Sequence, residues 1–241
     1  MKKYFWLPVI FLLTFQLACA VSLPSSKAGS GNVVTIDEAY SDFEALDISH
    51  AFIVEVVQGD TYRVVIRVDD NFVDDLEIVQ QGAILSIGLK PEFRGGITNA
   101  TLEAEVTMPD LSGIELSGAS QATLRGFSSN ESFSGQLSGA SQLRGEIEAG
   151  DTDLEVSGAG QVELSGQGDN LTINASGGSS VDLADYPVKD ASIHASGASN
   201  VIVNASGTLN ASASGASNVN YLGDPTLGSI DITGASSVSP E

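Results

Sequence analysis

The chain has 241 residues, of which 42% are apolar, and its 31 Asp and Glu outnumber 10 Lys and Arg to give a formal net charge of −21. The length allows one large domain or two small ones, and the apolar content excludes a chain that is disordered throughout. The acidic balance excludes nucleic acid as a partner, because phosphate binding requires clustered Lys and Arg, while cationic partners, divalent metals and neutral sugars stay open.

Residues 1–20 have the pattern of a secretory signal peptide. Lys2 and Lys3 precede an apolar run over 4–15, which corresponds to a charged n-region and an h-region. The run is short for a membrane span, and no later stretch is apolar over such a length. We therefore expect the body of the protein to lie outside the membrane.

The single cysteine, Cys19, lies just past this apolar run and excludes an intramolecular disulfide. Its position resembles the bacterial lipobox, whose cysteine is lipidated and becomes the first mature residue. Leu17 and Ala18 fit that pattern, whereas Gln16 stands where an apolar residue is usual. We predict a lipid anchor on Cys19 at the outer face of the cytoplasmic membrane. The alternatives are cleavage after Ala20, which gives a soluble secreted protein, and an uncleaved anchor.

Two segments connect this leader to the rest of the chain. Residues 21–32 are polar and rich in Gly, Ser and Pro, which predicts a flexible tether. Residues 33–111 are expected to form N-terminal strands without a helix. Four alternating, β-branched stretches in this part predict strands over 52–58, 62–68, 76–89 and 101–108. One connection between them is crowded with acidic residues, namely Asp69, Asp70, Asp74 and Asp75.

From residue 112 to 239 the motif Ser-Gly-Ala-Ser and its variants recur about every 20 residues, a period that indicates a solenoid. Both flanks of each motif alternate between apolar and polar residues, so each motif is predicted to be a corner that joins two short strands. Glycine would provide the positive φ, alanine would fill the tight inside, and serine would satisfy backbone groups. The central glycines are Gly118, Gly139, Gly158, Gly177, Gly197, Gly215 and Gly234.

The fold class predicted from this pattern is all-β: a right-handed parallel β-helix, or β-solenoid, with coils of about 20 residues, preceded by the N-terminal strands in a single domain over 33–239. The lipobox-like start, these strands and the "LSGAS" corners, led by "MPDLSGIELSGAS" at 108–120, resemble the "putative auto-transporter adhesin" family named for a head GIN domain. The resemblance implies a β-solenoid of the bacterial envelope with an adhesin-like character, and it carries over no catalytic residue.

Signals for catalysis are weak. His50 and His194 are the two histidines, and no nucleophile elbow, Walker A loop, zinc motif or paired cysteine motif is present. We therefore expect no catalytic residue and no cofactor. A β-helix that acts on polysaccharides, as a lyase or a hydrolase, is the enzymatic alternative, although the repeats contain only Arg125, Arg144 and Lys189 as basic residues.

Calcium is the one candidate ligand among metals, because hard cations prefer several carboxylate oxygens. Asp151, Asp153 and Glu155 alternate along one stretch and should share an outer strand face. They belong to a wider acidic band with Glu146, Glu148 and Glu163. A solvated acidic face explains the same pattern without a metal, and the cluster over 69–75 is open to both interpretations.

The function expected from the sequence is that of a cell-envelope lipoprotein, a non-enzymatic adhesion-like or binding scaffold for a polysaccharide or protein ligand outside the membrane. The polysaccharide-active enzyme is the first alternative, and an envelope sensor or structural spacer is the second. The oligomeric state is open, since the last coil ends in strand residues that invite edge pairing.

Overall fold

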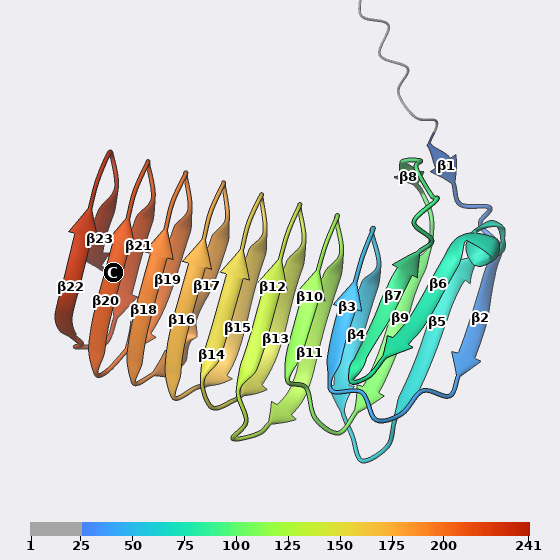
Figure 1. Cartoon of the computed structure of the whole chain (residues 1–241), viewed down its shortest axis with the longest axis horizontal. Helices are drawn as coiled ribbons and strands as arrows, with labels where there is room; N and C mark the ends of the chain where they lie inside the picture. Colours follow the sequence, from blue (N-terminus) through green and yellow to red (C-terminus); the bar gives the residue numbers. More distant parts are fainter. Residues whose placement is uncertain (1–25) are drawn as a thin grey trace, which may run out of the picture.

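The computed structural model describes residues 26–241, which form an elongated stack of coils with strands side by side along the long axis (Figure 1). The strands form two large sheets that enclose the core, and each coil of the repeat gives one strand to each sheet. All strand pairs within the repeat are parallel. The predicted β-solenoid is therefore confirmed.

The bounds of the elements follow the sheets. The ten-stranded sheet contains, in spatial order, β22 (Thr226–Ile232), β20 (Thr208–Ala213), β18 (Asp190–Ala195), β16 (Asn170–Ala175), β14 (Thr152–Val156), β12 (Phe133–Leu137), β10 (Gly113–Leu116), β3 (Ala45–Ile48), β7 (Ile84–Leu89) and β6 (Leu76–Gln81). The eleven-stranded sheet contains β2 (Val33–Glu38), β5 (Arg63–Asp69), β9 (Leu102–Met108), β4 (Ile53–Gln58), β11 (Gln121–Ser128), β13 (Gln142–Glu148), β15 (Gln161–Gln167), β17 (Ser180–Val188), β19 (Asn200–Ala205), β21 (Asn218–Leu222) and β23 (Ser237–Pro240). A small third sheet pairs β1 (Lys27–Ala28) with β8 (Ile97–Thr98), and η1 (Asp70–Asp75) is a short 3-10 helix.

The core is a set of apolar rows that run along the solenoid axis. Successive strand residues point to opposite faces, so every second residue enters the space between the sheets. One row consists of Val162, Val181, Val201 and Val219, which are register partners on neighbouring strands and are all buried. The alternation in the sequence thus determines which residues fill the interior and which stay on the two outer faces.

The corners explain why glycine recurs. Each of the seven predicted corner glycines has a positive φ, between 71° and 79°. A Cβ atom on Gly177 would lie 2.6 Å from the carbonyl oxygen of Gly158 in the preceding coil. That carbonyl accepts a 2.7 Å hydrogen bond from the N–H of Gly178, and the same bond recurs at the other corners. Glycine is therefore required both for its backbone conformation and for the close approach of successive coils.

Serine, rather than alanine, lies inside the corner. Ser199 is fully buried, and its hydroxyl donates a 2.8 Å hydrogen bond to the carbonyl of Ser196, whereas Ala198 is exposed. Ser120, Ser141 and Ser217 make the equivalent bond. The prediction that alanine fills the tight inside is wrong, because the residue two positions after the glycine, and not the next one, has its side chain directed into the core.

An additional coil precedes the seven that the glycines mark. Strands β3 and β4 pair in parallel with β10 and β11, and His50 takes the place of the corner glycine with a φ of 68°. The N–H of Ala119 donates a 2.6 Å hydrogen bond to the His50 carbonyl. Residues 59–112, which carry β5 to β9, are inserted between this coil and the next. The coils therefore begin at residue 45 and not at 112.

The N-terminal end of the stack is closed by strands that run against the coils. β2 and β5 pair antiparallel at the edge of one sheet, and β6 pairs antiparallel with β7 at the edge of the other. The four stretches predicted as strands are β4, β5, the pair β6 and β7, and β9. The expectation of no helix in this part is wrong, because the acidic connection forms η1.

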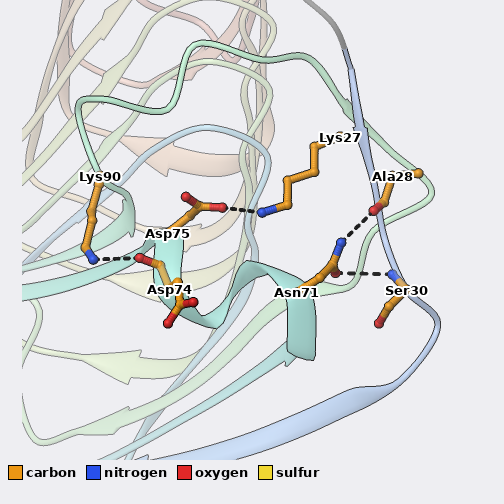
Figure 2. A network of polar contacts seen from close by, with 7 residues as sticks. All are labelled: Lys27, Ala28, Ser30, Asn71, Asp74, Asp75 and Lys90. Carbon is orange, nitrogen blue, oxygen red and sulfur yellow. Dashed lines mark hydrogen bonds and ion pairs between the residues drawn. The ribbon is translucent and has the colours of Figure 1, made fainter.

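Part of the predicted tether is bound to this end of the stack. From Lys27 onward the chain is held by the β1–β8 pairing and by a 2.5 Å ion pair between Lys27 and Asp75 (Figure 2). Asn71 adds two hydrogen bonds, accepting one from the N–H of Ser30 and donating one to the carbonyl of Ala28. The prediction of a flexible tether through residue 32 is therefore wrong for this part. The predicted signal peptide and Cys19 lie outside the described residues.

Among residues 26–241 there is no helix with the length and hydropathy needed to cross a bilayer.

Candidate functional site

The residues proposed to hold calcium lie along one strand without converging. Asp153 and Glu155 are exposed on β14, and Asp151 precedes it and accepts a 2.7 Å hydrogen bond from the side chain of Asn170. Their register neighbours are neutral: Ser134 and Thr172 beside Asp153, and Gln136 and Asn174 beside Glu155. Across residues 26–241, no three His, Cys, Asp or Glu side chains are grouped closely enough to hold a metal ion.

The wider acidic band is divided between the two sheets. Glu146 and Glu148 are on β13 and Glu163 is on β15, both in the eleven-stranded sheet, whereas Asp153 and Glu155 are in the ten-stranded sheet. The chain crosses from one sheet to the other at each turn of the coil, so residues close in sequence face opposite sides. The sequence pattern predicted one acidic band, and the coil separates it into two groups.

The acidic cluster over 69–75 anchors the N-terminal segment. Asp69 is buried, and its carboxylate accepts 2.6 Å hydrogen bonds from the N–H groups of Gly31 and Thr101. Asp70 accepts bonds from the side chains of Ser30 and Asn32, and these bonds lower the pKa of Asp70. These acceptor positions are occupied by protein donors, which supports a structural role for the cluster.

The two histidines have different surroundings. His194 is exposed on β18 with Asn174 and Ser212 as register neighbours. The Nδ1 atom of His50 accepts a 3.2 Å hydrogen bond from the N–H of Leu89, and burial lowers its pKa. His50 thus stabilises the first corner in its neutral form.

The outer face of the eleven-stranded sheet carries a continuous polar row, with one residue from each coil. Neighbouring members hydrogen-bond along the axis: the amide of Asn218 donates to Asn200 at 3.2 Å, and the hydroxyl of Ser237 donates to Asn218 at 2.8 Å. We call this the amide row. Its register partners are Gln121, Gln142, Gln161, Ser180, Asn200, Asn218 and Ser237.

A groove with a volume of about 500 Å³ lies beside the amide row on the same face. Its floor is formed by β13 and β15. Its two sides are bulges, one in β11 between Leu124 and Phe127 and the other in β17 between Leu183 and Pro187, where the strand register shifts. We call this the β11–β17 groove, and its polar side chains are Thr123, Arg125, Arg144, Glu146, Glu163, Ser165, Asp182 and Asp185.

The charges in the β11–β17 groove are separated along it. Towards β11, the Nε of Arg125 pairs with Glu55, and the Nε of Arg144 lies 3.3 Å from a carboxylate oxygen of Glu163. Towards β17, Glu163 and Asp182 are register partners, so two like charges lie directly opposite each other. The groove has a cationic end and an anionic end, in a chain whose repeats hold only three basic residues.

Sequence reasoning missed this groove, although one signal for it is present. The triplet "LRG" occurs at 124–126 and again at 143–145. Gly126 and Gly145 both have a positive φ, which marks the irregular backbone of the bulges. The register places Arg144 beside Thr123 rather than beside Arg125. Repetition of the triplet thus indicated irregular strands, while the relative positions of the arginines depended on the bulge.

Comparison with known proteins follows this geometry. Residues 42–225 match the model of the family described as "Putative auto-transporter adhesin, head GIN domain". A search of curated proteins finds no match.

Three crystal structures have similar folds. They are a "putative adhesin" from Bacteroides fragilis (TM-score 0.79, 16% identity, 89% of this chain and 100% of that chain), a "putative lipid binding protein" from Parabacteroides distasonis (0.70, 17%, 90% and 100%) and a "putative adhesin" from Parabacteroides merdae (0.67, 17%, 90% and 99%). At these identities the likeness shows the shared fold.

Proposed function

The chain belongs to the "putative auto-transporter adhesin, head GIN domain" family, and we propose that it is a non-enzymatic binding scaffold of the cell envelope. The observation that carries this proposal is the outer face of the eleven-stranded sheet, where the amide row and the β11–β17 groove present exposed polar groups on a rigid support. The names "putative adhesin" and "putative lipid binding protein" of the similar structures agree with a binding role.

The solenoid suits this role because its interior and its outer faces are independent. The inward rows and the corners hold the coils together, so the outward residues are free to serve a ligand. Neighbouring strands repeat about every 4.8 Å, and the amide row therefore offers a hydrogen-bonding group at a regular interval along the axis. An extended polymer such as a polysaccharide can make one contact per coil on such a surface.

A binding array tests the proposal. The protein is applied to immobilised glycans and matrix proteins, and a variant with Gln142→Ala and Gln161→Ala is compared with a control that carries Gln136→Ala and Thr172→Ala on the other sheet. We expect the first variant to lose about tenfold or more in affinity, equivalent to about 1.4 kcal/mol, and the control to match the wild type. Equal losses in both variants, or no binding by the wild type, would contradict the proposal.

One observation favours the enzymatic alternative, because the β11–β17 groove brings Arg144 close to several carboxylates. Glycoside hydrolysis requires two carboxyl groups at a set separation, and a lyase requires a base. Incubation with the glycans that bind, followed by measurement of reducing ends and unsaturated products, separates the two functions. A scaffold gives no product at any time point, whereas product formation that Glu163→Gln abolishes would establish the enzyme.

We also propose that a lipid on Cys19 holds the protein on the outer face of the membrane. The bound segment at Lys27 lies at the closed end of the stack, so an anchor upstream of it would direct the coils away from the bilayer. Labelling with palmitate and membrane fractionation test this, with Cys19→Ser as the variant. Loss of label and release from the membrane fraction support the anchor, and unchanged partitioning would remove it.

A further inference from the structure

We propose that the β11–β17 groove binds a zwitterionic group carried by a glycan, with its phosphate or carboxylate at Arg125 and Arg144 and its ammonium at Asp182 and Asp185. This ligand class rests on the proposed binding function and names the chemistry of its site. Four features of the groove lead to it: the orientation of the arginines, the unpaired carboxylates, the spacing between them and the charge of the whole chain.

The arginines are oriented to receive an anion. Both use their Nε atom for a carboxylate of the protein, Glu55 for Arg125 and Glu163 for Arg144. Within residues 26–241, neither terminal Nη group donates a hydrogen bond to a protein acceptor. A guanidinium held by one edge presents its remaining donors in a fixed plane, the geometry that binds phosphate or carboxylate.

The other end of the groove is suited to a cation. Glu163 and Asp182 face each other in register, an arrangement that destabilises neighbouring strands when no cation lies between them. Asp185 is exposed in the adjacent bulge. In the part of the chain that the structure describes, neither Asp182 nor Asp185 has an ion-pair partner. An ammonium at this end would relieve the repulsion and hydrogen-bond to the carboxylates.

The spacing matches a small zwitterion. Arg144 leans towards β15, where it pairs with Glu163, and Asp182 lies on the next strand, β17. Strands are about 4.8 Å apart, so the anionic and cationic subsites are on the order of 5–10 Å apart. A phosphoethanolamine substituent, with two bonds of carbon between its charged groups, fits this range.

The net charge of the chain restricts the carrier of this group. At −21, the protein repels polyanions and anionic lipid surfaces, whereas a zwitterion is neutral overall. The groove is also located on the side of the solenoid, so a bilayer could reach it only by lying against the acidic length of the molecule. A substituted glycan has access to the groove without that contact.

Calorimetric titration of the full chain with O-phosphoethanolamine tests the inference, with inorganic phosphate and ethanolamine as separate titrants. Arg144→Gln and Asp182→Asn are compared with two controls outside the groove, Arg63→Gln and Asp153→Asn, and thermal unfolding verifies that each variant is folded. We expect each groove variant to bind at least about tenfold more weakly and both controls to match the wild type. Each half-ligand should also bind at least about tenfold more weakly than the intact zwitterion.

Several results would overturn the inference. Phosphate that binds as tightly as the zwitterion would make the groove a simple anion site, and an unchanged Asp182→Asn variant would remove the ammonium subsite. Binding to phosphatidylethanolamine vesicles without binding to the soluble probe would assign the ligand to lipid rather than to glycan. If the array ligands bind but O-phosphoethanolamine neither binds nor competes, the zwitterion is wrong and the scaffold stands. If neither binds, the proposed function fails as well.

Discussion

Gly118 is stacked so closely on His50 that a Cβ atom on the glycine would lie 2.5 Å from the histidine carbonyl oxygen. His50 is therefore the first step of a ladder that every later corner glycine continues. It adopts the positive φ of those glycines, and its ring accepts the N–H of Leu89, so the histidine at this step also binds the neighbouring strand. The corner ladder, rather than any single motif, is the element that holds the coils in register.

The ladder predicts opposite effects for two adjacent glycines. Gly177→Ala places a Cβ atom 2.6 Å from the Gly158 carbonyl at a φ of 76°, whereas a Cβ atom on Gly178 has no neighbour closer than 3.9 Å. We expect Gly177→Ala to lower the free energy of unfolding by at least about 2 kcal/mol. Gly178→Ala should be neutral or stabilising by up to about 1 kcal/mol. Denaturant unfolding measures both, and equal losses would contradict the ladder.

His50 predicts a dependence of stability on pH. Burial lowers its pKa in the folded state below the ordinary value of 6.5, so the unfolded chain binds the proton more readily. The stabilisation is complete above about pH 6.5 and decreases as the pH falls from there through the folded-state pKa. In His50→Asn, which keeps a side chain that tolerates positive φ, the fall in unfolding temperature between pH 7.5 and 5 should be smaller. Parallel curves for the two proteins would refute this.

Asp69 predicts how firmly the N-terminal segment is held. Its carboxylate accepts the N–H groups of Gly31 and Thr101 in a buried setting. Asp69→Ala leaves both donors without an acceptor, which costs about 1–3 kcal/mol for each. We expect a clear loss of stability and faster cleavage by trypsin after Lys27. Asp60→Ala, an exposed acidic residue near the same end, is the control and should be cleaved at the wild-type rate.

The inward serines predict a smaller effect. Ser199→Ala removes the 2.8 Å hydrogen bond to the Ser196 carbonyl and should cost about 1 kcal/mol, because a neutral hydrogen bond has roughly this net value. Ser192→Ala on the outer side of β18 should change the unfolding free energy by less than about 0.5 kcal/mol. A neutral Ser199→Ala would show that the buried hydroxyl is dispensable, as it is in the coil where Gly160 takes its place.

The coils from 112 onward could be predicted because their order in space is their order in sequence. Val162 and Val181 are one period apart and become register partners, so the repeat itself supplies the register. The first coil could not be found in this way. Histidine replaces its glycine, and the inserted strands β5 to β9 separate it from the coil on which it packs.

The candidate site was less accessible from the sequence. Asp151, Asp153 and Glu155 were singled out for their alternation, and the structure places them among neutral neighbours. Arg125, Arg144 and Asp182 were not grouped, because they come from three coils and two bulges determine their relative positions. A contact between coils depends on register, and one extra residue in a bulge moves every later side chain along the strand.

The sequence by itself determined the repeating part of this protein: alternating residues select the interior, and a glycine every 20 residues permits the bend and the close stacking that a Cβ atom would block. The tertiary structure decided what the repeat does not encode. It placed His50 under Gly118, bound Lys27 to Asp75, divided the acidic band between two sheets and formed the β11–β17 groove. Local periodicity specifies a coil, whereas contacts between distant or irregular segments arise only when the coils are stacked.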